Sequence, residues 1–492
     1  MVAPSVPHDP RPSFARRLHR RGPGTALAAV AASALMVSAC SSSGSSSTAA
    51  SSNAPASSAP AASSSDTGSA AASSAVPVTA TTLWVQSGDG GSDALLKGYA
   101  DLNKKFEAAH PGVTVKFTVK NFNDLVNTLK LQLSGSDVPD VTQVNQGYGS
   151  LGQLVTDKLV ASLDDAATAG KWSTRQSDSL LALDGKFSPD GKTMGSGSLY
   201  GVAATGAWDG LFKNTEQATK LAITAPPATF ADLEADLAKA KAGGITPLMY
   251  GTSDGGEPIW LTAELLIAQG KPQLLTDIVN GANPNLPPEL LTAAQTLKKW
   301  ADAGYFTKGA DAFSSNDVIG KFAKGEGLFA LNGSWNVFSS STPAQAAKFS
   351  LIPFPLAAAG SSAAIATGDL PWSVPAKAKH ADLAAQYIDF LTDPANNGTW
   401  IANGQVPASV SGTEAADTKS NNIVGVSADA ILNWGTLQKG GTSLPFPDWA
   451  TPTFYDTISK SAQSLAGGKL TPEAFVAALQ KDYGAFTAKR KG

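Results

Sequence analysis

An alternation of strand-like and helix-like segments over residues 82–147 constrains the fold of this 492-residue chain most strongly. The stretch Thr82–Phe106 opens with an apolar run, passes a glycine-rich bend at 88–91, and continues with apolar residues at helical spacing. Ser92 is a good N-cap for that helix, and His110-Pro111-Gly112 ends it. The opening unit is therefore predicted to be a strand, a tight bend and an amphipathic helix.

The next segments repeat this order. Residues 113–119 alternate as a half-buried strand, 121–133 repeat as a helix, and 138–144 read as a third strand. A β-α-β-α-β order predicts an α/β fold with a mainly parallel sheet and right-handed crossovers. Such sheets bind ligands at their strand ends, which here are Gln86–Gly91 and Asn145–Gly147.

The N-terminus indicates export. Arginines between positions 11 and 21 precede an apolar run at 25–37, which is shorter than the roughly 20 residues of a membrane span. The run ends in small residues before Cys40, the single cysteine of the chain. This resembles a bacterial lipobox, which implies that residues 1–39 are a lipoprotein signal peptide and that Cys40 is lipidated. The alternative is an ordinary secretory signal with an incidental cysteine.

Residues 40–78 are rich in serine and alanine, with almost no charge and no apolar period. Such a segment is predicted to be a flexible tether. A lipid anchor followed by a tether predicts that the body, from about residue 79, is displayed on the extracellular face of the cell membrane.

Charge and histidine content narrow the classes of function. The formal net charge is −3 and no basic tract follows the signal, so nucleic acid is not expected as a partner. Only His110 and His380 remain after the signal, which leaves little material for a histidine metal site or a Ser-His-Asp triad. We therefore expect neither metal nor cofactor. The bend at 88–91 also lacks nucleotide signatures, because Asp93 stands where a dinucleotide fingerprint has its third glycine.

Tryptophan is plentiful, with 10 in the chain, and most lie near Gly, Pro, Asp or Asn rather than within apolar runs. Tryptophans in such turns commonly line a site or an interface. Trp84 and Trp300 lie in apolar periodic contexts and are predicted to be core, whereas Trp434 and Trp449 are predicted to lie in loops near the C-terminus.

The motifs after residue 82, taken in order to about residue 408, resemble those of the extracellular solute-binding lipoproteins of ABC importers. The resemblance is to their carbohydrate branch, in which maltose-binding protein belongs. After the opening strand-bend-helix, the motifs are Pro139-Asp140-Val141, Leu199–Val202 with Lys213-Asn214, Pro226–Phe230, Phe322–Trp335, and Gly368–Lys379 followed by Ala384–Leu391. Two departures are Phe212, where the family usually has a tyrosine, and Asp369 with Trp372, where small residues are frequent.

The resemblance implies a two-lobed periplasmic-binding-protein-like fold with the ligand cleft between the lobes. Each lobe would be a mainly parallel sheet flanked by helices. One lobe would comprise residues 79–203 and 368–408, and the other 204–367 and 409–492. The protein would be a monomer that captures a mono- or oligosaccharide by hinge closure and delivers it to membrane permease subunits. No catalysis is implied.

A sugar presents an apolar face and a rim of hydroxyls, so its site needs aromatic rings and polar side chains. The candidates for stacking are Trp208, Trp260, Trp335 and Trp372, for each of which core packing is the alternative. The candidates around the hydroxyl rim are Asp89, Gly90, Asn145, Gln146, Glu257 and Asp369. For the two aspartates a role in stabilising their own turns is the alternative.

Two other functions remain open at this stage. A secreted glycoside hydrolase would also be rich in tryptophan, but it needs two carboxylates at a defined separation, and the sequence singles out no such pair. A surface lipoprotein that senses glycans without feeding an importer is the other alternative.

Overall fold

The computed structural model describes residues 80–89, 92–337, 342–360, 363–440 and 443–490. By compactness the chain divides into Met1–Ser73 and Ser74–Gly492, and every described residue belongs to the second unit. The predicted signal peptide, the tether with Cys40, and Gly90 lie outside the described residues. None of the described helices is both long and apolar enough to cross a membrane.

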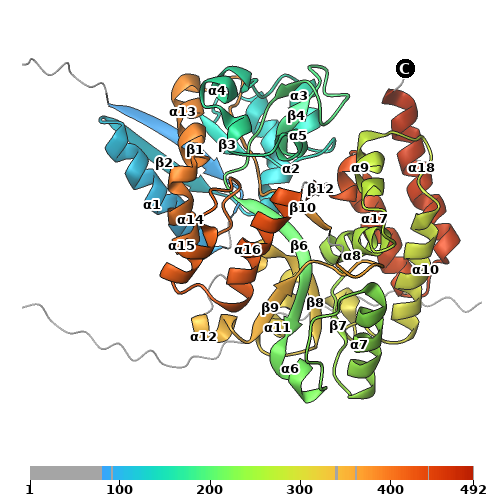
Figure 1. The fold of residues 1–492 in the computed structure, drawn as a ribbon. Helices are drawn as coiled ribbons and strands as arrows, with labels where there is room; N and C mark the ends of the chain where they lie inside the picture. The colour runs from blue at the N-terminus through green and yellow to red at the C-terminus, as the bar shows by residue number, and fades with distance from the viewer. Residues whose placement is uncertain (1–79, 90–91, 338–341, 361–362, 441–442, 491–492) are drawn as a thin grey trace, which may run out of the picture. The chain divides into compact units, whose positions relative to one another are not determined.

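Helices and strands follow one another along the described chain (Figure 1). Up to residue 203 the elements are β1 (Thr81–Ser87), α1 (Asp93–Ala109), β2 (Val113–Val119), α2 (Phe122–Ser134), β3 (Val141–Gln143), α3 (Leu151–Thr156), α4 (Asp164–Ala169), the 3-10 helix η1 (Trp172–Thr174), α5 (Asp178–Gly185), β4 (Lys186–Phe187) and β5 (Ser198–Leu199). The next are β6 (Gly206–Asn214), α6 (Thr215–Lys220), α7 (Phe230–Ala242), β7 (Leu248–Met249), α8 (Gly256–Ile267), α9 (Gln273–Asn280), α10 (Glu289–Asp302), η2 (Ala310–Ala312), α11 (Ser315–Ala323), β8 (Phe329–Gly333), η3 (Ser334–Asn336), α12 (Pro343–Ala346), β9 (Phe349–Ile352) and β10 (Ala364–Gly368). The last are β11 (Trp372–Ser373), α13 (Ala381–Leu391), η4 (Pro394–Asn396), α14 (Asn397–Ala402), α15 (Glu414–Ser420), α16 (Gly425–Gly440), β12 (Ser443–Leu444), η5 (Pro447–Ala450), α17 (Phe454–Ala466) and α18 (Pro472–Arg490).

The first sheet has the strand order β11-β3-β1-β2. Strand β1 is parallel to both β2 and β3, with Val85 opposite Phe117 on one side and Val141 on the other. Only β11 is antiparallel. The parallel sheet predicted from the β-α-β-α-β order is thus confirmed for this part of the chain.

Helix α1 begins and ends where its sequence predicts. The Ser92 side chain accepts a hydrogen bond from the Leu95 N–H at 3.4 Å, and the helix ends at His110, just before Pro111. Its buried face carries Leu95, Tyr99, Leu102 and Phe106, among others, at the spacing of an amphipathic helix. Burial of this face holds α1 against the first sheet.

The second sheet corrects the prediction of mainly parallel strands in both lobes. Its order is β12-β10-β6-β8-β7, with β9 also paired to β6. Strand β6 is antiparallel to β8, β9 and β10, and only the β10–β12 and β7–β8 pairs are parallel. Strands β9 and β10 are both antiparallel to β6, with β9 along Leu211–Asn214 and β10 along Gly206–Trp208.

The helices α8, α10, α17 and α18 pack together beside the second sheet (Figure 1). Their apolar core includes Leu266, Leu297, Ile458 and Leu479. Trp300 is fully buried there, as predicted. The prediction that Trp434 lies in a loop is wrong, because this residue lies within α16 and is 1 % exposed.

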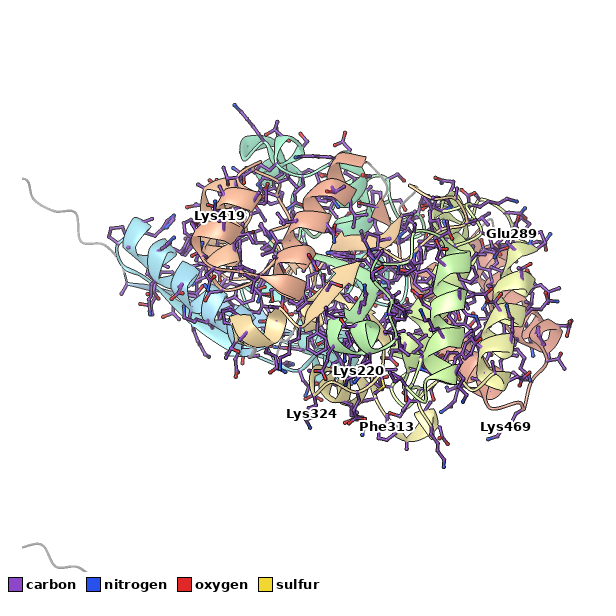
Figure 2. All side chains as sticks on the ribbon, turned by 60° about the horizontal axis from the view of Figure 1, so that its bottom comes forward. Lys220, Glu289, Phe313, Lys324, Lys419 and Lys469 are labelled. Carbon is purple, nitrogen blue, oxygen red and sulfur yellow. The ribbon has the colours of Figure 1, made fainter. Side chains whose placement is uncertain are left out.

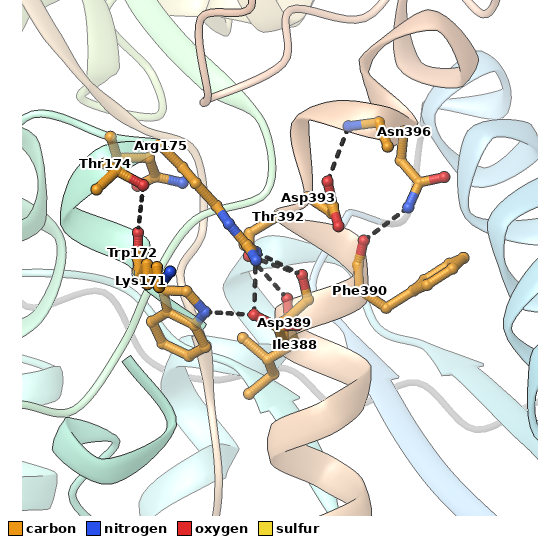
Figure 3. A network of polar contacts seen from close by, with 12 residues as sticks. Lys171, Trp172, Thr174, Arg175, Ile388, Asp389, Phe390, Thr392, Asp393 and Asn396 are labelled. Carbon is orange, nitrogen blue, oxygen red and sulfur yellow. Dashed lines mark hydrogen bonds and ion pairs between the residues drawn. The ribbon is translucent and has the colours of Figure 1, made fainter. Parts of the chain in front are cut away.

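A polar network ties the segment 368–408 to the first part of the chain (Figure 3). The Asp389 carboxylate on α13 accepts hydrogen bonds from Trp172 Nε1 at 2.7 Å and from Arg175 Nη1 at 3.0 Å. Strand β11 also joins the first sheet, whereas every strand of the second sheet lies in 204–368 or after 409. The lobe boundaries 79–203 with 368–408 and 204–367 with 409–492 stay a prediction.

Charged side chains differ sharply between surface and interior. Lys324, Lys419 and Lys469 are exposed and lie on the outside of the ribbon (Figure 2). Asp209 of β6 and Glu264 of α8 are instead fully buried, and neither Asp209 oxygen has a hydrogen-bond partner among the described residues. Desolvation raises the pKa of both carboxyls well above the usual range, and the charge of Asp209 adds to the rise for Glu264.

We predict that Asp209→Asn stabilises the protein increasingly as pH rises. The raised pKa keeps the folded-state carboxyl protonated, while the same group ionises in the unfolded chain above about pH 4. The parent protein therefore loses up to about 1.4 kcal/mol of stability per pH unit between the unfolded and the folded pKa, a loss that asparagine removes. Denaturant unfolding at several pH values from 5 to 8 measures the difference. Asp311→Asn at an exposed position is the control, and equal pH slopes for parent and Asp209→Asn would contradict the prediction.

Candidate functional site

Two half-buried carboxyls lie close together where β1 and β10 end. Asp89 follows β1, and its Oδ2 accepts hydrogen bonds from the Ser87 hydroxyl at 3.1 Å and the Tyr99 hydroxyl at 3.3 Å. Asp369 follows β10, and its Oδ1 accepts from the Leu370 N–H at 2.9 Å. The latter bond stabilises the turn of Asp369 itself, as the alternative reading of this residue predicted.

Desolvation dominates the electrostatics of the two carboxyls. Desolvation raises the pKa of Asp369 to about 8, and the charges of Asp89 and Asp184 add to the rise. Desolvation also raises the pKa of Asp89. Each side chain keeps part of its surface accessible. A neutral carboxyl both donates and accepts hydrogen bonds, so this pair suits a partner that also does both.

A layer of buried polar groups holds the Asp369 turn in place. Gln146 Nε2 donates to the carbonyl of Gly368 at 2.8 Å and to that of Asp369 at 3.3 Å. Asp184 Oδ1 accepts from the Gly368 N–H at 2.8 Å. A Cβ at position 368 would lie 2.2 Å from the Ala203 Cβ, so only glycine fits there. The Gln146 side chain thus lies at the site, but it hydrogen-bonds main-chain carbonyls there.

Gln143 fixes the bend after β1 in the same way. Its Oε1 accepts from the Gly88 N–H at 2.7 Å and the Ser87 hydroxyl at 2.9 Å, and its Nε2 donates to the Tyr99 hydroxyl at 3.1 Å. Asn145, two residues further on, is half-buried, and its side chain makes no hydrogen bond with the other described residues. Its amide remains available to a ligand.

Aromatic rings form the second group of the site. Trp335 of η3 and Trp260 of α8 are both half-buried and meet edge to face, with ring centroids 5.5 Å apart. The ring centroids of Phe446 and Trp335 are 6.3 Å apart, and those of Trp449 and Phe446 are 5.5 Å apart. The predicted pair Trp260 and Trp335 is therefore brought together, half-buried Phe446 extends it, and the buried Trp449 packs against Phe446.

Carboxyl groups accompany these rings. Asp448, between Phe446 and Trp449, is half-buried, and desolvation raises its pKa to about 7. Its charge acts on the buried Asp209 and on Tyr455. The charged groups that raise the pKa values of Asp369 and Asp209 are all acidic. The site therefore combines aromatic surface with carboxyls whose pKa burial raises, to about 8 for Asp369 and about 7 for Asp448.

Residues 146–148 connect the polar group to the aromatic group. While Gln146 holds the Asp369 turn, the next residue, Gly147, lies directly against Trp449. A Cβ on Gly147 would stand 2.7 Å from the Trp449 Cβ, and its φ of +81° also favours glycine. The Tyr148 N–H donates to the Trp449 carbonyl at 3.2 Å.

Three predicted ligand residues are fully buried in this structure, and their role in binding stays a prediction. Trp208 is fully buried, with its Nε1 donating to the Ala430 carbonyl at 2.9 Å. Trp372 is fully buried against Tyr99. Glu257 is fully buried at the start of α8, where its Oε2 accepts a hydrogen bond from the Gly251 N–H. None of the three presents a surface to a ligand in this structure, because strand pairing or helix packing turns each one inward.

Other residues of the site were missed by the sequence reasoning. They are Phe446, Asp448, Trp449, Asp184 and Tyr99. The stretch Phe446-Pro447-Asp448-Trp449 carries the same signal as Trp335, an aromatic residue in a turn beside proline or an acid. Asp184 and Tyr99 lie on helices, and no local pattern sets them apart. Within the described ranges, no cluster of three or more His, Cys, Asp or Glu is arranged to hold a metal ion.

Curated relatives of the chain are distant. A multiple sugar-binding protein of Streptococcus mutans is 23 % identical over 388 residues, which cover 76 % of this chain and 86 % of that protein. A Brucella abortus protein named as a binding protein is 27 % identical over 233 residues, 46 % of this chain. The match spans only 52 % of the Brucella protein's length.

Solved structures share the fold. A chitin oligosaccharide binding protein superposes with a TM-score of 0.69 at 21 % identity, covering 83 % of this chain and 99 % of that one. The GacH receptor of Streptomyces glaucescens gives a TM-score of 0.66 at 18 % identity, covering 83 % and 98 %. These are two-lobed receptors of mixed α/β architecture, so the predicted fold class is confirmed.

The family model for bacterial extracellular solute-binding proteins matches residues 101–432, which include β3, β6, the Asp369 turn and Trp335. Proteins of this family bind solutes for transporters and are not enzymes. By this match, the chain belongs to the bacterial extracellular solute-binding protein family.

Proposed function

We propose that this protein is the substrate-binding component of an ABC-type sugar import system and captures a mono- or oligosaccharide. The observation that carries the proposal is the pair of half-buried rings Trp335 and Trp260, in a structure that also holds half-buried carboxyls whose pKa burial raises to neutral pH or above. Trp335 and Trp260 offer faces and edges to the C–H surface of a sugar ring. Asp369 and Asp448 offer hydrogen bonds to its hydroxyls.

The names of similar proteins support a carbohydrate ligand. The Streptococcus mutans relative is a multiple sugar-binding protein, and similar structures include a chitin oligosaccharide binding protein and RafE in complex with raffinose. A glycoside hydrolase is not favoured, because the family is one of binding proteins.

Charge at the site favours a neutral sugar. The carboxyl groups at the site act on one another, as Asp89 does on Asp369 and Asp448 on Asp209. A carboxylate on the ligand would have to stay charged in the same desolvated surroundings that favour the neutral form of the site's own carboxyls. Uronic acids are therefore expected to bind more weakly than the corresponding neutral sugars.

Capture proceeds by closure of two lobes about the crossings near residues 203, 368 and 408. Ligand contacts both lobes only when they are closed, so binding shifts the population toward the closed state. The closed monomer then presents both lobes to membrane permease subunits and releases the sugar to them. Lipidated Cys40 and the tether keep the protein on the extracellular face of the cell membrane.

A sugar panel tests the ligand class. Saturating amounts of a bound neutral mono- or oligosaccharide should raise Tm and change tryptophan fluorescence, because the ligand stabilises only the folded state and covers Trp335. The panel should include uronic acids, polyamines and peptides. Responses to polyamines or peptides with none to any sugar would reject the carbohydrate proposal.

Replacing Trp335 tests its role in stacking. Trp335→Ala should weaken sugar binding roughly tenfold or more, as loss of a central aromatic contact commonly does. Its Tm should change little because the side chain is half-buried. Trp208→Ala is the matched comparison, since loss of this fully buried ring should cost about 3–5 kcal/mol of stability. Equal losses of stability in the two variants would show that Trp335 is a core residue.

Cys40→Ser tests the anchor. The parent protein expressed in a bacterium with lipoprotein processing should fractionate with membranes, and mass spectrometry should find acyl chains on Cys40. The variant should move to the soluble or secreted fraction, because no other cysteine is present to carry the lipid. Membrane association that is unchanged in Cys40→Ser would contradict the proposed anchor.

A further inference from the structure

The last described helix, α18, reaches the segment that follows β3. The ring centroids of Phe486 and Tyr148 are 5.2 Å apart, with the ring planes at 59°. The Arg490 guanidinium lies 4.4 Å from the Tyr148 ring centroid and 5.8 Å from that of Phe486. These distances are those of aromatic packing and of a cation–π contact.

Each partner is positioned from its own side. The Tyr148 hydroxyl accepts a hydrogen bond from the Met194 N–H at 2.9 Å, and its ring meets Phe187 edge to face at 5.8 Å. Tyr148 is 3 % exposed. Arg490 Nη2 lies 3.5 Å from the Asn280 carbonyl, its acceptor at the end of α9. The Tyr148 ring is thus held by its own neighbours, and the Arg490 guanidinium, at the end of α18, lies over that ring.

A backbone contact accompanies these side chains. The Tyr148 N–H donates to the Trp449 carbonyl at 3.2 Å, beside the close approach of Gly147 to the same residue. Tyr148 and Gly147 belong to the range 79–203, whereas Trp449, Phe486 and Arg490 belong to 409–492. The chain passes between these ranges near residues 203, 368 and 408, so the contact can open without unfolding either part.

We propose that Arg490 and Phe486 form a latch with Tyr148 that holds the two lobes closed and slows the release of ligand. This inference rests on the proposed function for its effect on ligand. Arg490 contacts Tyr148 rather than the ligand. It acts as a positioning residue, because it favours the closed arrangement of the two lobes. A single cation–π contact of this kind shifts an equilibrium by about fivefold.

Ligand release is the first test. With the neutral sugar that gives the largest thermal shift in the panel, Arg490→Ala should raise the dissociation rate about fivefold and leave the association rate nearly unchanged. Arg490→Lys should restore part of the effect because it keeps a cation. Lys489→Ala, which removes an exposed neighbouring charge, is the control and should behave as the parent. An unchanged dissociation rate in Arg490→Ala overturns the latch.

Hydrogen exchange without sugar is the second test and does not depend on the ligand class. The Tyr148 amide should exchange faster in Arg490→Ala than in the parent or in Lys489→Ala, because opening releases it from the Trp449 carbonyl. Faster exchange with no response to any sugar would uphold the latch while the sugar proposal fails. Equal exchange in all three proteins overturns the latch. If Arg490→Ala does not fold, Phe486→Leu replaces it, because it removes the ring and keeps an apolar side chain.

Discussion

Hydrogen bonds around Gly368 join the chain segments that run between the two sheets, and the arrangement of the site depends on them. Here β10 pairs with the start of β6, Gly368 opposite Gly206, while the Asp369 N–H donates to the Thr205 carbonyl at 2.8 Å. The third crossing joins at the same place, because the Gly206 N–H donates to the Val406 carbonyl at 2.8 Å. All three passages of the chain between the sheets are therefore bonded to one another, which fixes their mutual position through main-chain groups.

The chemistry of the site follows from this junction. Gly368 leaves room for Asp184 and Ala203, and the turn that follows it carries Asp369, on whose pKa the charge of Asp89 acts. On the other side, Gly333 permits the Trp335 ring to fold back closely, since a Cβ there would lie 2.1 Å from it. The close packing that Gly368 and Gly333 permit thus determines the positions of the Asp369 carboxyl and the Trp335 ring. Burial then shifts the carboxyls toward their neutral form, which suits hydroxyl ligands better than cations.

Local pattern predicted much of the first sheet and its helices, because apolar periodicity and capping residues act over a few positions. Ser92 and Pro111 delimit α1 as predicted. The direction of β6 relative to β8, β9 and β10 was not predicted, since strand pairing depends on residues more than a hundred positions apart. Burial of a side chain also depends on distant residues. The turn context of Trp335 indicated partial exposure, which the structure shows, whereas the same context at Trp372 did not indicate that its side chain is fully buried. The turn places Trp372 on a strand under Tyr99, which comes from a distant helix.

The pairing of β11 with β3 has a consequence for biogenesis. Residues 372–373 complete a sheet whose neighbouring strand ends at residue 143, and Asp389 completes the contacts of Trp172 and Arg175 from a similar distance in the chain. A chain emerging from the ribosome or a secretion channel lacks these partners until more than two hundred further residues have appeared. The first sheet is therefore completed late, although β1, β2 and β3 lie within residues 81–143, and closure of such long loops is slow. A polypeptide built this way can complete its first sheet only after most of the chain is available.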